Sequence, residues 1–187
     1  HEAISLLFMN QVNVEFNGQL TLAIQVFKGE YNRKFMLQLI SSQLDMDRMD
    51  YLKRDSFYSG VSEGNINSER LIQMMNVVDD VLVIEEKGIY SVEKFLMSRR
   101  LMYWQVYLHK TSLVAELILT KILKRAKELT QKGVHLPCSA PLTFFMENKV
   151  TISTFDVETL DLIAQMDDFD FIIALKSWQK QDDFILS

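Results

Sequence analysis

Most of the chain consists of segments in which apolar residues recur every three or four positions, the spacing that gathers them on one side of an α-helix. The helices predicted in this way cover the ranges Gly18–Lys28, Arg33–Ser42, Asp45–Tyr58, Asn67–Met75, Ser91–Gly133, Leu142–Met146, a segment that starts near Thr154 or Asp156, and Asp168–Gln179. The longest tract is expected to break or bend near His109–Ser112. We therefore predict an all-α fold.

One segment has a different pattern. Four aliphatic residues at Val81–Ile84 are followed by Glu85–Gly88 and then by Ile89 and Tyr90, which predicts a short β-hairpin over about residues 81–90. The composition agrees with a helical protein, because only 2 prolines and 6 glycines occur in 187 residues and turns are therefore scarce. Helices with one small hairpin are the expected architecture.

Length and charge narrow the class of protein. A chain of 187 residues has the length of one domain, and the prolines at 137 and 141 mark a linker, so we predict a region 1–133 and a helical segment 134–187. The longest apolar stretches are too short for a membrane span. A net charge of −5 argues against broad nucleic-acid binding. The single cysteine, Cys138, favours a reducing, cytoplasmic location.

The helix predicted at Asp45–Tyr58 carries an unusual polar face. At about 100° per residue, its acidic, basic and phenolic side chains fall within one arc of about 120°. These residues are Asp47, Arg48, Tyr51, Arg54, Asp55 and Tyr58. One interpretation is a solvated face of ion pairs. The alternative is a helix buried nearly all round, because tyrosine is unusual on a solvated stripe and the flanking positions are apolar. Its charges would then need partners.

A second polar stripe lies on the long helical tract. Arg99, Tyr103, Tyr107 and Lys110 share one face by the same geometry, and such cations and phenols are suited to holding phosphate groups. The alternative is that Arg99 and Lys110 extend over a core-facing aromatic pair. His109 lies beside this stripe, where a lone histidine is more commonly a structural hydrogen-bonding group than a ligand.

These residues carry a resemblance to a known family. The run from Asp45 to Ser56 resembles the D-x-D-R-x-D-Y-x-x-R-D-S/C signature of HD-superfamily phosphohydrolases, in the branch that includes deoxynucleoside triphosphate triphosphohydrolases. Arg99 and the Y-x-H-K element ending at Lys110 are similar to that branch's phosphate- and sugar-contacting helix. The opening residues His1–Ser5 resemble its H-E-x-x-S element. The resemblance implies a helical HD-domain-like bundle.

The resemblance also implies roles. In the family, the matching residues act as follows: Asp47 as a metal ligand, Arg48 as a phosphate contact, Tyr51 and Asp55 in the sugar pocket, Arg99, Tyr107 and Lys110 in further phosphate and ribose contacts, and His1 as a catalytic histidine. The implied cofactor is a divalent metal ion (Mn, Mg, Fe or Zn), and the implied substrates are nucleotides, with (deoxy)nucleoside triphosphates as the expected class. A homo-oligomer is also implied.

The chain departs from the family pattern in its histidines. The family places a first metal histidine and a His-Asp dyad before the H-E-x-x-S element, whereas His109 and His135 follow it and neither precedes an aspartate. We therefore expect a C-terminal portion of a longer HD protein, inactive by itself. Two alternatives stay open: a nucleotide-binding or regulatory HD-like module without catalysis, and a structural helical oligomerisation domain.

Overall fold

The fold was analysed in a computed structural model that describes residues 2–151 and 154–186. The chain divides into two compact units. The first, here called the motif unit, is formed by Met9–Leu113. The second, here called the C-terminal unit, is formed by the residues from Val114 onward together with the start of the chain up to Phe8. Each unit has a hydrophobic core of its own.

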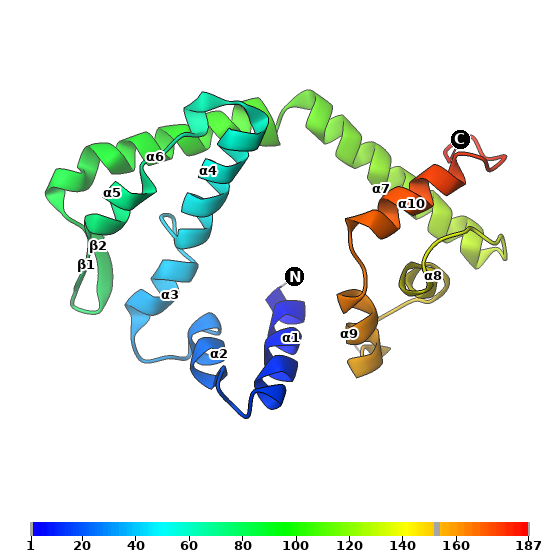
Figure 1. The fold of residues 1–187 in the computed structure, drawn as a ribbon, viewed down its shortest axis with the longest axis horizontal. Helices are drawn as coiled ribbons and strands as arrows, with labels where there is room; N and C mark the ends of the chain where they lie inside the picture. Colours follow the sequence, from blue (N-terminus) through cyan, green and yellow to red (C-terminus); the bar gives the residue numbers. More distant parts are fainter. Residues whose placement is uncertain (1, 152–153, 187) are drawn as a thin grey trace. The chain divides into compact units, whose positions relative to one another are not determined.

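Short helices build the first part of the motif unit (Figure 1). Its elements are α1 (Glu2–Glu15), whose first residues belong to the other unit, α2 (Thr21–Phe27), α3 (Lys34–Ile40), α4 (Met46–Ser59), the 3-10 turn η1 (Ser62–Gly64) and α5 (Ser68–Gln73). The helices predicted between residues 18 and 75 are thus confirmed; α4 is shifted by one residue and the other three are somewhat shorter. Helix α1 had no counterpart among the predictions.

Helix α4 has clear signals at both ends. The side chain of Asp45 accepts a hydrogen bond from the backbone N–H of Arg48 (2.8 Å), which satisfies a donor that has no partner inside the helix. Gly60 ends the helix in the left-handed conformation at φ 71°, which glycine adopts without a steric penalty. The local sequence therefore determines where this helix starts and stops.

The hairpin exists, but the predicted range of 81–90 is wrong. Strand β1 (Met75–Val78) pairs antiparallel with β2 (Val81–Ile84), with Val78 opposite Val81. The turn consists of Asp79 and Asp80, both at positive φ, which aspartate tolerates better than most residues. Residues 86–88 form the 3-10 turn η2 (Glu86–Gly88), and Ile89 begins α6 (Ile89–Met102) instead of a second strand.

The long tract is interrupted where a break was expected. Helix α6 continues into a π-helical turn, η3 (Tyr103–Tyr107), in which the N–H of Leu108 bonds to the carbonyl of Tyr103 five residues earlier (2.7 Å). Helix α7 (Lys110–Gln131) starts two residues later. Such π turns are rare and occur frequently at functional sites. The predicted break near His109–Ser112 is confirmed, slightly earlier in the chain.

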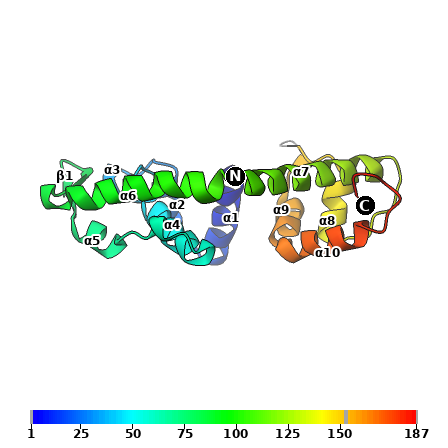
Figure 2. The same cartoon turned by 90° about the horizontal axis from the view of Figure 1, so that it is seen from above.

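The core of the motif unit lies between α4, α5 and α6. Its buried members are Met49, Leu52, Ile66, Leu71, Phe95 and Met102. Helix α5 lies beside the N-terminal half of α6 in both views (Figures 1 and 2). Turn η1 approaches so closely that a Cβ on Gly64 would lie 2.6 Å from the Met102 sulfur. Glycine at this position thus permits the packing that fixes α4 against α6.

The C-terminal unit is built on α7, α8 (Ala140–Glu147), α9 (Val157–Ala164) and α10 (Asp168–Trp178). Its core contains Ala126, Leu142, Ala174 and the fully buried Trp178, whose indole N–H donates to the carbonyl of Pro137 (3.1 Å). The predicted division between 1–133 and 134–187 stays a prediction. Within the described residues, no helix is long and apolar enough to cross a membrane. The predicted all-α class is confirmed.

Candidate functional site

The two predicted polar stripes meet in the motif unit. Helix α4 packs against α6, and the Tyr107 hydroxyl donates a hydrogen bond to the Asp55 carboxylate at 2.6 Å. The rings of Tyr51 and Tyr107 contact edge to face, with centroids 6.0 Å apart and an interplanar angle of 74°. Residues 52 positions apart in the sequence thus form one cluster of side chains.

The stripe on α6 continues through the π turn. The guanidinium of Arg99 lies 5.8 Å from the ring centroid of Tyr103, within the range of a cation–π contact. Tyr103 in turn contacts Tyr107 edge to face at 5.2 Å. Because the extra residue of a π turn changes the phase of the helix, this turn decides which way Tyr107 points relative to Arg99.

Two guanidinium groups belong to the cluster. Arg48 donates through Nη1 to the Asp45 carboxylate and to the carbonyl of Ser42. Arg99 donates through Nη1 to the Gln43 side-chain oxygen at 2.9 Å. Both cations act on Tyr51: burial and the neighbouring Tyr103 raise the pKa of its phenol, whereas Arg99 and Arg48 lower it. Their positive charges therefore lie on the same side of the molecule as the phenols.

The phenol of Tyr107 is held in its protonated form. Burial, followed by the hydrogen bond to the Asp55 carboxylate, raises the pKa of Tyr107 well above the usual value of 10 for a tyrosine. At neutral pH the cluster consequently presents guanidinium and phenol donors and one carboxylate acceptor. This set of groups can bind a polyanion together with a hydroxyl group.

Three further predicted site residues are Asp47, Lys110 and His1. Asp47 and Lys110 are exposed, at the first turns of α4 and α7. His1 lies outside the described residues. The histidine beside the stripe, His109, accepts a hydrogen bond through Nδ1 from the backbone N–H of Thr111 (3.3 Å), as expected of a structural histidine.

The expectation that α4 is buried nearly all round is wrong. Its C-terminal aromatic residues, Phe57 and Tyr58, are each 80% exposed, and Arg54 pairs with Asp50 at 2.5 Å on the solvated side. Burial is confined to Met49, Leu52 and Ser56. The helix therefore combines both interpretations, with a solvated ion pair on one side and partnered charges near α6.

A complete metal site is absent from the described part of the chain. No three histidine, cysteine, aspartate or glutamate side chains gather there in a way that could hold an ion. Protein sites for divalent transition metals use three or four such ligands. Asp47 can therefore supply one ligand, and the residues of this chain that the structure describes do not fit a metal on their own.

Sequence reasoning missed the roles of two residues at the site. Asp45 and Gln43 hold the two guanidinium groups. Tyr103, which was placed on the stripe, links Arg99 to Tyr107. An aspartate directly before a helix is an N-cap signal, so the position of Asp45 was recognisable, although its bond to the Arg48 side chain was not. Gln43 carried no signal, because its partner is 56 residues away.

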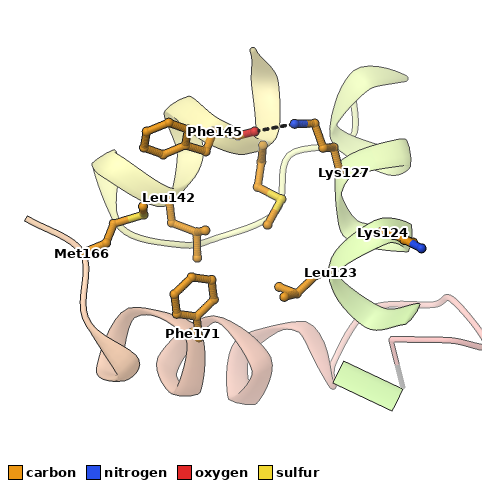
Figure 3. A pocket seen from close by; sticks show the side chains of 8 residues that line it. Leu123, Lys124, Lys127, Leu142, Phe145, Met166 and Phe171 are labelled. Carbon is orange, nitrogen blue, oxygen red and sulfur yellow. Dashed lines mark hydrogen bonds between the residues drawn. The ribbon is translucent and has the colours of Figure 1, made fainter. Parts of the chain in front are cut away.

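The C-terminal unit contains a pocket of about 280 Å³ between α7, α8 and α10 (Figure 3). Its walls are apolar, formed by Leu123, Leu142, Phe145, Met146, Met166 and Phe171. The amine of Lys127 at its edge donates to the backbone carbonyl of Phe145 (2.9 Å), and Lys124 points away from the cavity (Figure 3). Apart from these two lysines, the residues that line the pocket are apolar.

Comparison with known proteins finds a family model and several relatives. Residues 66–135, from the loop before α5 to just beyond α7, match the model of the HD associated region. An uncharacterised protein of Bacillus subtilis, YwfO, is 41% identical over 165 residues, which cover 87% of this chain and 36% of that protein. A homologue of the deoxynucleoside triphosphate triphosphohydrolase SAMHD1 from Dictyostelium discoideum is 28% identical over 99 residues, or 51% of this chain and 19% of its own length.

A solved structure agrees with the fold over nearly the whole chain. It is that of a phosphohydrolase from Bacteroides thetaiotaomicron, with a TM-score of 0.95 and 56% identity, covering 98% of this chain and 46% of that protein. The chain spans less than half the length of these relatives. By its HD associated region and its likeness to a phosphohydrolase, the chain belongs to the HD-superfamily phosphohydrolases.

Proposed function

We propose that this chain supplies the phosphate- and sugar-binding half of a metal-dependent phosphohydrolase that acts on nucleotides, with (deoxy)nucleoside triphosphates as substrates. In this proposal Arg48 and Arg99 bind phosphate oxygens, Tyr51 and Asp55 line the sugar pocket, and Tyr107 completes the ribose contacts. Lys110 and His1 are assigned a further phosphate contact and a catalytic role by the same family resemblance.

The observation that carries the proposal is the meeting of two cations, three phenols and the carboxylates of Asp45 and Asp55 in one cluster. A triphosphate needs several positive donors, and guanidinium groups bind its oxygens with directed hydrogen bonds. A ribose needs an acceptor for a hydroxyl group and a flat apolar surface, and Asp55 with the rings of Tyr51 and Tyr107 offers both. Two relatives, a phosphohydrolase and a homologue of a deoxynucleoside triphosphate triphosphohydrolase, support the same class of reaction.

The metal belongs to the proposal for the whole protein. Asp47 would provide one ligand, and the remaining ligands would come from the part of the relatives' length that this chain does not span. A divalent ion in such a site supplies Lewis-acid activation of water and phosphate. The role of the residues in this chain is to bind and orient the substrate and to stabilise the negative charge that develops during hydrolysis.

The test is hydrolysis by the full-length protein. Each of the four deoxynucleoside triphosphates and their ribonucleotide counterparts is incubated with Mn²⁺, Mg²⁺, Fe²⁺ or Zn²⁺, and the release of nucleoside, tripolyphosphate and phosphate is followed by chromatography. Arg99→Ala should lower kcat/KM by roughly 10- to 100-fold, the usual effect of removing one charged hydrogen-bond donor. Arg54→Ala is the matched control, because that arginine, on α4, pairs with Asp50 in solvent.

Two outcomes would contradict the proposal in different ways. Nucleotide binding without turnover under every metal would favour a regulatory module, the second of the functions considered. If the protein neither binds nor hydrolyses nucleotides, the remaining interpretation is a structural helical oligomerisation domain. The 187-residue chain alone is expected to show no hydrolysis, and turnover by it would contradict the assignment of ligands to other parts of the protein.

We also propose that the protein forms a homo-oligomer, as the family resemblance implies. Light scattering coupled to size-exclusion chromatography measures the mass directly. A monomer at micromolar concentration would contradict this part of the proposal without affecting the assignment of the site.

A further inference from the structure

The turn that joins α3 to α4 contacts both guanidinium groups of the cluster. We infer that this turn, here called the clamp turn (Ser41–Asp45), is a positioning segment that gives the two arginines different tasks: Arg99 supplies net positive charge for a polyphosphate, and Arg48 supplies oriented donors with little net charge. The inference rests on the proposed function, because it concerns the same anion site. It assigns roles to Asp45 and Gln43, which do not themselves touch the ligand.

Asp45 is fixed from several directions. It is 2% exposed, and its carboxylate accepts hydrogen bonds from the backbone N–H groups of Ser42 (3.1 Å) and Arg48 (2.8 Å). The guanidinium of Arg48 adds a third bond to the same carboxylate and also donates to the carbonyl of Ser42. A side chain held by a buried carboxylate and a backbone carbonyl loses much of its rotational freedom, so its remaining N–H donors point in a set direction.

The charge of Arg48 is largely balanced by its partner. A carboxylate in contact with a guanidinium forms a pair with no net charge, so its long-range attraction for an anion is weak. The pair can still bind a phosphate through the donors that face away from Asp45. Arg48 therefore contributes direction more than charge.

Arg99 has the opposite environment. Its Nη1 donates to Gln43, a neutral amide, and its guanidinium lies over the ring of Tyr103. Neither partner carries a negative charge, so the positive charge of Arg99 stays uncompensated. Gln43 holds this arginine in place while leaving its attraction for an anion intact.

A consequence distinguishes this arrangement from two independent arginines. Removal of Arg48 leaves the Asp45 carboxylate without its cation, beside the position of the anion, and a carboxylate repels phosphate. Asp45→Asn should then restore part of the affinity that Arg48→Ala loses. Asparagine is an equally good N-cap, so this change removes the charge and keeps the start of α4.

The experiment measures binding of inorganic tripolyphosphate to the full-length protein by calorimetry, in EDTA to exclude divalent metal ions, at 50 and 200 mM NaCl. The variants are Arg48→Ala, Asp45→Asn, their double variant, Gln43→Ala and Gln43→Glu, with Arg54→Ala as control. Arg48→Ala should weaken binding by roughly 10- to 100-fold, and the double variant should bind several-fold more tightly than Arg48→Ala. Gln43→Glu should weaken binding more than Gln43→Ala and reduce its salt dependence, because the new carboxylate neutralises Arg99.

The results that overturn the inference are equally definite. If Asp45→Asn changes the affinity by the same factor in the unmodified protein and in Arg48→Ala, the two residues act independently and Asp45 is not a positioning residue. If Asp45→Asn lowers the melting temperature but leaves affinity unchanged in every background, its role is structural only. If the unmodified protein binds tripolyphosphate and the Gln43 variants bind it equally well, the inference about the clamp turn is wrong while the proposed function stands. If the unmodified protein does not bind tripolyphosphate, both fail.

Discussion

The two units of this protein use polar side chains in different ways. In the C-terminal unit, Asp156 caps α9, Asp167 caps α10, and Asp183 forms an ion pair with Arg125, 58 residues away. In the motif unit, long-range contacts bring several kinds of group into one cluster: Asp55 bonds to Tyr107, and Arg99 bonds to Gln43 and lies over Tyr103. Caps and a single ion pair stabilise the packing of helices, whereas several long-range contacts in one cluster gather specific groups at one place. The second arrangement is the one expected of a binding site.

The comparison first predicts that each unit depends on its own core. Trp178→Ala removes a fully buried indole and its bond to Pro137, and should cost about 3–5 kcal/mol. Phe95→Ala, the matched change in the motif unit, should cost a similar amount. Hydrogen exchange should show faster exchange mainly after residue 113 for the first variant and mainly in residues 9–113 for the second. The same exchange pattern for both variants would contradict two separate cores.

A smaller loss of stability is expected from a substitution at Gly64, where η1 approaches α6. Gly64→Ala would place its Cβ 2.6 Å from the Met102 sulfur and 2.8 Å from the Ser56 Cβ, so the neighbouring residues must shift. The free energy of unfolding, measured in urea, should fall by about 1–3 kcal/mol. Gly60→Ala is the control: nothing lies within 4 Å of its Cβ, and only the positive φ of 71° opposes the change. Gly60→Ala should lower the free energy of unfolding by about 1 kcal/mol. Equal costs would show that the close approach at Gly64 can relax.

The phenols of the motif unit predict a response to alkaline pH. The pKa values of Tyr51 and Tyr107 are raised in the folded protein, so both phenols contribute stability below the usual tyrosine pKa near 10, and this contribution is lost as the pH rises above it. Tyr107→Phe should cost about 1 kcal/mol at pH 7, because Asp55 loses a donor, and should flatten the alkaline decline. Unfolding measured between pH 7 and 11 tests both. An unchanged alkaline slope would contradict the role of Tyr107.

The smallest expected effect is a loss of stability of the C-terminal unit at acidic pH. The Arg125 guanidinium holds the pKa of Asp183 below its usual 3.8. The pKa of Asp156 is lowered by hydrogen bonds from Thr159, and that of Asp170 by a hydrogen bond from the backbone N–H of Asp167. Depressed pKa values contribute stability above the unfolded value, which is lost as the pH falls below about 4. Asp183→Asn should therefore lower stability slightly at pH 7 and leave it almost unchanged at pH 2.5. Thermal unfolding at both pH values measures the difference, and an equal loss at pH 2.5 would contradict the ion pair.

The helices were predictable because their signals are local. The prediction of α4 as residues 45–58 lies within one residue of its observed bounds, and the break after α6 was expected within a few residues. The hairpin was placed one strand too late because Val81–Ile84 was recognised as a strand, whereas its partner Met75–Val78 was not, and Met75 was assigned to the preceding helix. Aliphatic runs of four residues fit either structure, and only the pairing resolves them.

The sequence by itself determined which groups are present at the site: two polar stripes, their residue types and the family they resemble. The tertiary structure decided their partners. The packing of α4 on α6 brought Asp55 to Tyr107, and the clamp turn brought Gln43 to Arg99. The physical reason is range, because capping and helical periodicity act within a few residues. Contacts across 50 residues depend on how whole helices pack.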